Sequence, residues 1–247
     1  MKRLFMIWMS LTCWAAVQAQ NKAAADSAYA AGKYDEAISL YSGMLKEGES
    51  ADIYYNLGNC YYKTDRIAPA VLNYERAFLL DPADADVRFN LELARAKTVD
   101  KIIPESEMFF ITWFKSLVNV MSMDGWACTG VVAFVLMCLL AFVFYFSNRV
   151  ALKKLGFFGA LFMLLVVIFS NIFAYRQYVA QTVRTGAVVM TASEVVKSTP
   201  NESGTDLFVL HEGTRVEIID DSMKDWKEIR IADGKRGWIP AKSMEII

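Results

Sequence analysis

Cysteine and histidine, which often serve as nucleophiles, general bases and metal ligands, are few in this chain of 247 residues, and they do not cluster. Its four cysteines are Cys13, Cys60, Cys128 and Cys138, and its one histidine is His211. The sequence has no Cys-x-x-Cys pair, no Ser/His/Asp or Cys/His arrangement and no glycine-rich phosphate motif. These absences argue against nucleophilic catalysis, a zinc site and nucleotide binding. We therefore expect no enzymatic activity, no cofactor and no metal, with His211 as an exposed residue at the end of a strand.

Residues suited to recognition are more frequent, and in the region 20–101 they follow a repeat of about 34 residues. The small, aromatic and proline positions of one copy, counted from Ala51, are filled by Tyr54, Leu57, Gly58, Tyr61, Ala70, Tyr74, Ala77 and Pro82. A weaker copy precedes it, with Gly32, Ala37 and Tyr41 at matching places, and a third unit opens at Ala85 with a single helix. The region resembles tetratricopeptide repeats, in which paired helices stack into a solenoid.

This resemblance implies a concave face that holds an extended peptide or a partner helix. The candidate residues on that face are Lys22, Asp26, Tyr29, Asp52, Tyr55, Asn56, Asn59 and Tyr62. Family members that clamp a C-terminal carboxylate need a different set of side chains where Asp26, Asp86 and Asn90 stand, so we do not predict a carboxylate clamp. Packing between the repeats is an open alternative role for the tyrosines.

Alternating apolar residues and turn signals occupy 185–247 and predict a small all-β domain. Its landmarks are Leu210-x-x-Gly213-x-x-Val216, Trp226-x-x-Ile229 and Asp233-Gly234-x-x-Gly237-Trp238-Ile239. In this order they resemble the bacterial Src-homology-3-like barrels, which often bind cell-wall peptides or protein partners. Trp226 and Trp238 are the candidate residues of a ligand groove. The alternative, which the sequence alone favours, places both tryptophans in the core or under a turn.

Two apolar runs, 125–146 and 155–175, contain no charged side chain, and each exceeds the roughly 20 residues that a helix needs to span a bilayer. The segment 147–154 between them carries Arg149, Lys153 and Lys154 and no acid, so the positive-inside rule places it in the cytoplasm. Uncharged spans offer no ion or proton path, and we predict a membrane anchor.

Residues 1–19 have a basic start, an apolar run and a small-residue end, which predicts a signal peptide cleaved after Ala19. An uncleaved anchor helix is the alternative, and a lipid-modified Cys13 fits less well. Together with the basic loop, the leader places 20–101 and 185–247 in the periplasm, with 176–184 as a linker.

Residues 102–124 contain a dense aromatic cluster from Met108 to Phe114, relieved by few polar side chains. We predict an amphipathic helix that lies on the surface of the bilayer. The alternative is a helix docked on the tetratricopeptide core as its last packing element.

The whole chain thus predicts a multi-domain membrane protein: α-helical tetratricopeptide repeats, a two-helix transmembrane hairpin and a C-terminal all-β Src-homology-3-like barrel. This order resembles the BatE family of the Bat aerotolerance operon in Bacteroides-type bacteria, also over Trp113–Leu117, Met123–Trp126 and Asn201–Thr205. The resemblance implies an inner-membrane scaffold beside von Willebrand A-type Bat proteins and a MoxR-type ATPase. The alternative function is a cell-envelope sensor that binds peptidoglycan. A net charge of −1 gives no reason to expect nucleic-acid binding.

Overall fold

The computed structural model describes residues 21–247, which form two compact units. The first unit contains the described residues up to Leu79, together with Asp84–Ser106 and Thr185–Ile247. The second contains Leu80–Ala83 and Glu107–Arg184. The predicted signal peptide at 1–19 lies outside the described residues.

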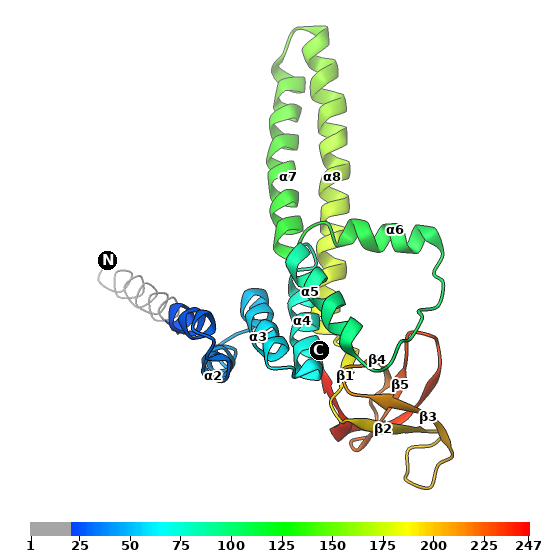
Figure 1. The fold of residues 1–247 in the computed structure, drawn as a ribbon. Helices are drawn as coiled ribbons and strands as arrows, with labels where there is room; N and C mark the ends of the chain where they lie inside the picture. The colour runs from blue at the N-terminus through cyan, green and yellow to red at the C-terminus, as the bar shows by residue number, and fades with distance from the viewer. Residues whose placement is uncertain (1–20) are drawn as a thin grey trace, which may run out of the picture. The chain divides into compact units, whose positions relative to one another are not determined.

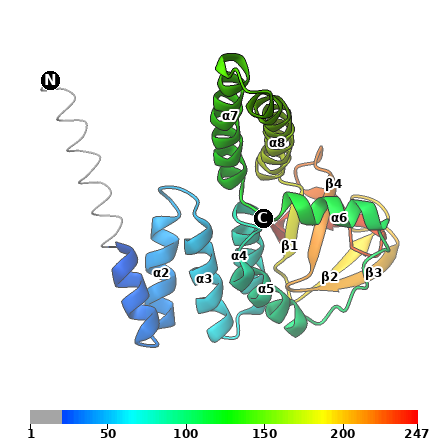
Figure 2. The ribbon, with the colours of Figure 1, turned by 90° about the horizontal axis from the view of Figure 1, so that it is seen from above.

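The first unit begins with paired helices that stack side by side (Figures 1 and 2). They are a helix at 21–30, α2 (Tyr34–Met44), α3 (Ala51–Lys63), α4 (Ile67–Leu80) and α5 (Ala85–Lys97). Asp84 caps α5, because its carboxylate accepts hydrogen bonds from the backbone N–H groups of Asp86 and Val87 at 2.8 and 3.1 Å. Gly58 is small because a Cβ there would lie only 2.7 Å from the ring of Tyr74. The helices of the second repeat therefore meet where the repeat pattern predicts contact.

Seven strands of the same unit form one antiparallel sheet with the order β3-β2-β6-β5-β4-β1-β7. They are β1 (Gly186–Val189), β2 (Ser193–Lys197), β3 (Asp206–His211), β4 (Arg215–Asp220), β5 (Trp226–Arg230), β6 (Arg236–Pro240) and β7 (Met244–Ile246), with a 3₁₀ turn η1 (Ala241–Ser243) before β7. Its core includes Val196, Leu210, Ile229 and Ile239, all fully buried or nearly so. Gly234, at φ 85°, supplies the tight turn between β5 and β6 that the Asp-Gly pair predicts.

The repeats and the sheet share a hydrophobic core. Val188 of β1 and Ile247, which directly follows the edge strand β7, belong to one buried cluster with Ala70 and Val71 of α4 and Leu91 of α5. A solenoid needs a cover on the apolar face of its last helices. Because the third unit of the repeat region has only one helix, the β domain provides that cover.

A buried carboxylate joins the same elements. Glu75 of α4 is 4% exposed and pairs with Arg95 of α5 and with Arg215 of β4, the latter at 3.4 Å. Nearby, Arg76 donates to Glu245 at 3.0 Å and to the carbonyl of Ile246 at 2.6 Å. The repeats and the β domain are therefore linked by charge as well as by apolar contact.

The second unit consists of α6 (Phe109–Val118), α7 (Met123–Phe146) and α8 (Val150–Thr182), with α7 and α8 packed as a long antiparallel hairpin (Figure 1). α7 has 24 residues and α8 has 33, and their most apolar windows have mean hydropathies of 2.7 and 2.4. Only 11% of each window is buried, which is too little for core helices of a water-soluble protein. The two helices are thus compatible with a two-span membrane hairpin.

α8 is longer at both ends than its apolar run at 155–175, because the basic and amide residues on either side also favour helix. The backbones of the two helices come close together at Gly156. A Cβ there would lie 2.7 Å from the carbonyl oxygen of Leu140 and from the backbone nitrogen of Phe144. Such close approach of backbones is typical of helix pairs in membranes.

Candidate functional site

The repeat region places equivalent residues of its two copies in equivalent hydrogen bonds. The Tyr41 hydroxyl donates to Asp26 at 2.5 Å, and the Tyr74 hydroxyl donates to Asn59 at 2.6 Å. In both repeats the bond joins the second helix to the first, with partners 15 residues apart. Burial and the bond to the Asp26 carboxylate both raise the pKa of Tyr41. These two candidate binding residues, Asp26 and Asn59, therefore already hold their repeats together.

The second repeat brings several polar groups together around Asn59. The Asn90 amide of α5 donates to the Tyr55 hydroxyl at 2.8 Å and to Asn59 at 3.3 Å. Tyr62 lies beneath the Lys97 ammonium group, 4.3 Å from its ring centre. These contacts support a packing role for the tyrosines. We propose that only the parts of their rings that remain exposed could contact a bound peptide.

The other candidates of the first helices are more open. Lys22 pairs with Asp26 at 3.5 Å, Asp52 is exposed, and Asn56 is half-buried. The half-buried Tyr29 ring packs edge-on against Tyr34 at 5.4 Å.

Sequence reasoning missed two apolar residues on α5. Phe89 and Leu93 are 66% and 41% exposed. Counted from Ala85, they occupy the repeat positions that Tyr55 and Asn59 occupy counted from Ala51. Applying the repeat to the third unit would have identified them.

Trp226 and Trp238 both lie on the outer face of the β domain. Across β5 and β6, Trp226 lies opposite Pro240, and Glu228 lies opposite Trp238. Directly opposed residues point to the same face of a sheet, so both tryptophans are on one face. The intervening Ile229 and Ile239 are fully buried. Both tryptophans are half-buried and out of phase with these isoleucines along their strands, so neither lies in the core, and the alternative of packing under a turn stays open.

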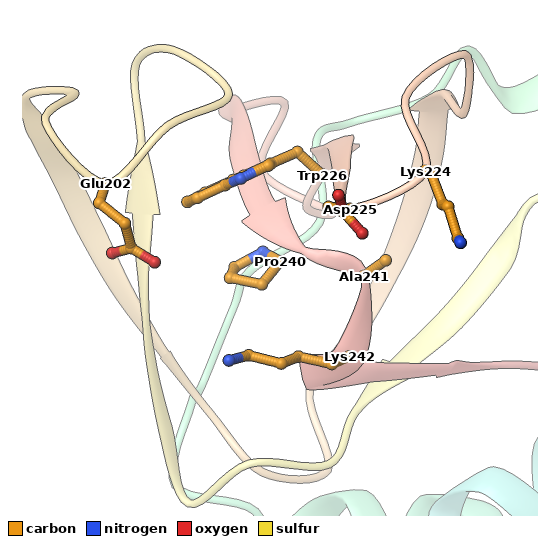
Figure 3. Close-up of a pocket in the computed structure, with 7 residues that line it drawn as sticks. All are labelled: Glu202, Lys224, Asp225, Trp226, Pro240, Ala241 and Lys242. Carbon is orange, nitrogen blue, oxygen red and sulfur yellow. The ribbon is translucent and has the colours of Figure 1, made fainter.

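One of the tryptophans lines a pocket of about 580 Å³. Its lining residues are Glu202, Lys224, Asp225, Trp226, Pro240, Ala241 and Lys242. Figure 3 shows the Trp226 indole above the Pro240 ring, with the Glu202 carboxylate and the Lys242 ammonium group at the same end. Trp238 is not part of this pocket. An aromatic and proline surface beside side chains of both charges can bind a short peptide that carries both a carboxylate and an amine.

His211 is the end of β3, as expected, but it is not free. The Asp100 carboxylate, in the segment after α5, accepts from the backbone N–H of His211 at 2.7 Å and from the Thr214 hydroxyl at 2.6 Å. The His211 ring nitrogen Nδ1 lies 2.8 Å from the other Asp100 oxygen. A second tether follows, because the backbone N–H of Glu105 donates to the carbonyl of Ala232 at 2.9 Å. The residues after the repeats are thus tied to the β domain.

The Asp100 contacts predict a dependence of stability on acid. Burial raises the pKa of Asp100, but the hydrogen bonds from Thr214 and His211 outweigh it and hold the pKa below its usual range. A carboxyl group whose pKa is lowered by folding stabilises the folded state at any pH above its unfolded-state pKa of about 4. This stabilisation is lost as the pH falls through the folded-state pKa. Asp100→Asn should cost about 1–3 kcal/mol at neutral pH and flatten the acid dependence below about pH 4. Hydrogen exchange of the first unit against pH measures both effects.

Asp65→Asn is the matched control, because Asp65 forms only an exposed pair with Lys97 at 3.3 Å. We expect that change to alter stability by less than about 0.5 kcal/mol. An Asp100→Asn protein with the acid dependence of the unaltered chain would contradict the assignment.

Between residues 21 and 247, no group of three or more His, Cys, Asp or Glu side chains could hold a metal ion. Cys60 is fully buried, and burial raises the pKa of its thiol to about 11, which keeps it protonated at neutral pH.

Comparisons with known proteins agree with this architecture. The tetratricopeptide-repeat family profile matches residues 28–88, and the profile described as bacterial SH3 domain matches residues 195–245. A search of the curated proteins finds no match. The chain therefore carries a repeat region of the tetratricopeptide type and a C-terminal bacterial SH3 domain. Both kinds of domain are typically non-catalytic binding modules, for protein partners or for peptidoglycan.

Proposed function

We propose that the chain is a non-enzymatic scaffold of the bacterial inner membrane that presents its repeats and its SH3 domain as one composite binding unit. The observation that carries this proposal is the shared core, in which Val188 and Ile247 pack among residues of α4 and α5. Partners bound to the repeats and to the SH3 domain would be held in a fixed arrangement. A flexible connection between the two would give no such control.

The membrane placement rests on α7 and α8. Both are mostly exposed and apolar, and the segment that joins them is basic. We propose that Arg149, Lys153 and Lys154 are cytoplasmic and that both termini of the mature chain are periplasmic. Reporter fusions at residues 101, 151 and 247 should read outside, inside and outside. An inside result at 101 or 247 would exclude this topology.

We further propose that the protein works in a Bat-type assembly. The support is the resemblance of the whole chain to the BatE family, which implies von Willebrand A-type Bat partners and, indirectly, a MoxR-type ATPase in stress or oxygen tolerance. Affinity purification of the full chain in mild detergent, with and without cross-linking, should recover the von Willebrand A-type proteins. Recovery of none under either condition would contradict the proposal.

A second function is favoured by the pocket at Trp226. Its aromatic and proline surface lies among two acidic and two basic side chains, Glu202, Asp225, Lys224 and Lys242. This combination suits the short peptides of peptidoglycan, which carry both free amines and carboxylates. The protein would then sense or bind the cell wall through the SH3 domain.

Replacing Trp226 tests whether the SH3 domain binds the cell wall through this pocket. Trp226→Ala should weaken co-sedimentation of the full chain with purified cell wall by about tenfold or more, as expected for an aromatic anchor worth about 2 kcal/mol. Trp238→Ala is the matched control, because Trp238 lies on the same face of the sheet but outside the pocket. Equal binding by the two folded variants would argue against this pocket as the ligand site.

A further inference from the structure

Helix α6 has a strongly one-sided surface. At about 100° per residue, Phe109, Trp113 and Leu117 fall beside Phe110, Phe114 and Val118, whereas Thr112 and Lys115 occupy the opposite side. The apolar side is only partly covered. Phe109, Phe110 and Trp113 are 85%, 51% and 63% exposed. A cluster of this size is rarely left open to water.

The end of α6 is held firmly against the hairpin. Gln177 of α8 is 5% exposed, and its amide nitrogen donates to the carbonyls of Val118 and Met121, both at 2.7 Å. The Trp126 indole of α7 donates to the same Val118 carbonyl at 2.8 Å. These donors satisfy carbonyl groups that the end of a helix leaves unpaired. α6 therefore ends beside the hairpin and projects sideways from it, and does not continue along it (Figure 1).

Contacts of the apolar side show at what level of the hairpin α6 lies. The Phe114 ring packs on Phe173 at 5.7 Å, and the Arg176 guanidinium lies 5.9 Å from the centre of the same ring. Arg176 is the first charged residue of α8 after Lys154. At 1.5 Å per residue, the segment between these two charges matches a hydrocarbon layer roughly 30 Å thick. Arg176, and α6 with it, therefore stand at one boundary of that layer.

We propose that the hydrogen bonds from Gln177 and Trp126 hold α6 at the bilayer surface. Phe109, Phe110 and Trp113 then enter the boundary between headgroups and acyl chains. In this position they fix the depth and rotation of the hairpin. This inference rests on the proposed membrane placement of α7 and α8. The sequence predicts a surface helix somewhere in 102–124, and the contacts with α8 assign its level, its orientation and the residues that enter the lipid. Aromatic side chains favour that boundary. The Lys115–Glu107 pair, at 2.5 Å, lies on the polar side and remains in water.

Spin labels test the proposal on the full chain in phospholipid nanodiscs, with the native cysteines replaced. Single labels are placed at Phe109 and Trp113 on the apolar side, at Thr112 and Lys115 on the polar side, and at Leu136 within α7. The readout is the logarithm of the accessibility to oxygen over that to a water-soluble nickel complex. We expect positive values at 109, 113 and 136 and negative values at 112 and 115.

Three other outcomes would each overturn a different part of the proposal. A positive value at 136 with negative values at 109 and 113 overturns the surface role and leaves the membrane span intact. A negative value at 136 overturns the membrane placement itself. Protection of 109 and 113 from both reagents overturns the inference in favour of a protein partner.

A second variant tests whether the Gln177 hydrogen bonds hold α6 in place. Gln177→Leu should shift the label at Trp113 towards the aqueous reagent, because Gln177 acts as a positioning residue for α6. Thr182→Val is the matched control, since the Thr182 hydroxyl bonds only within α8, to the carbonyls of Tyr178 and Val179 at 2.9 and 3.2 Å. An unchanged depth of the Trp113 label in the Gln177→Leu chain would overturn the positioning role of Gln177.

Discussion

Replacing Arg95 and Arg215 together by methionine should destabilise the first unit by about 3–5 kcal/mol, the usual cost of leaving a buried charge without its partners. Both arginines pair with Glu75, whose carboxylate is 4% exposed and has little access to water. Each single change leaves Glu75 one partner, so we expect each to cost clearly less than half of the double change. The free energy of opening, from hydrogen exchange of α4, α5 and β4 in the full chain, measures these effects.

The matched rescue is Glu75→Met in the same double variant. Replacing a whole buried charge cluster by apolar side chains is often neutral or stabilising, so the triple variant should recover most of the loss. Destabilisation of the triple variant as large as that of the double variant would contradict the account, because it would assign the loss to packing and not to the unpaired carboxylate.

Gly156→Val should separate α7 from α8. Its added side chain would meet the backbone of Leu140 and Phe144, which cannot move aside as a flexible side chain can. We expect a cost of about 3 kcal/mol, the upper end for overpacking. Cysteines placed at Phe144 and Phe157, whose rings are 5.8 Å apart, should form a disulfide efficiently in the parent hairpin and poorly in the Gly156→Val chain.

Gly159→Ala is the matched control. A Cβ at Gly159 would lie 3.1 Å from a terminal methyl group of Leu140, and a small rotation of that side chain relieves the contact. We expect disulfide formation close to that of the parent chain. Equally efficient cross-linking in the Gly156→Val chain would show that the helices do not approach as closely as described.

Much of the local structure followed from periodicity. The repeat of small and aromatic residues predicted α3, α4 and α5, and alternation with turn residues predicted the strands of the SH3 domain. The family profiles at 28–88 and 195–245 confirm both regions. The positions of Trp226 and Trp238 outside the core were also readable from alternation with Ile229 and Ile239.

The candidate site was less accessible from the sequence. Glu202 and Lys242 are polar residues in ordinary polar surroundings, and only the fold brings them beside Trp226. Asp26 and Asn59 were assigned to binding because of their repeat positions, whereas the fold uses both as acceptors for Tyr41 and Tyr74.

By itself, the sequence determined the parts of this protein: a solenoid of tetratricopeptide type, two helices long and apolar enough to span a membrane, and a bacterial SH3 domain. These features depend on neighbours a few residues apart, and residue spacing records them directly. Only the tertiary structure decided that the SH3 domain closes the solenoid, that Asp100 holds His211, and that Gln177 fixes the end of α6. The last two contacts join residues 111 and 59 positions apart, and they arise because buried polar groups must find partners wherever the packed faces place them.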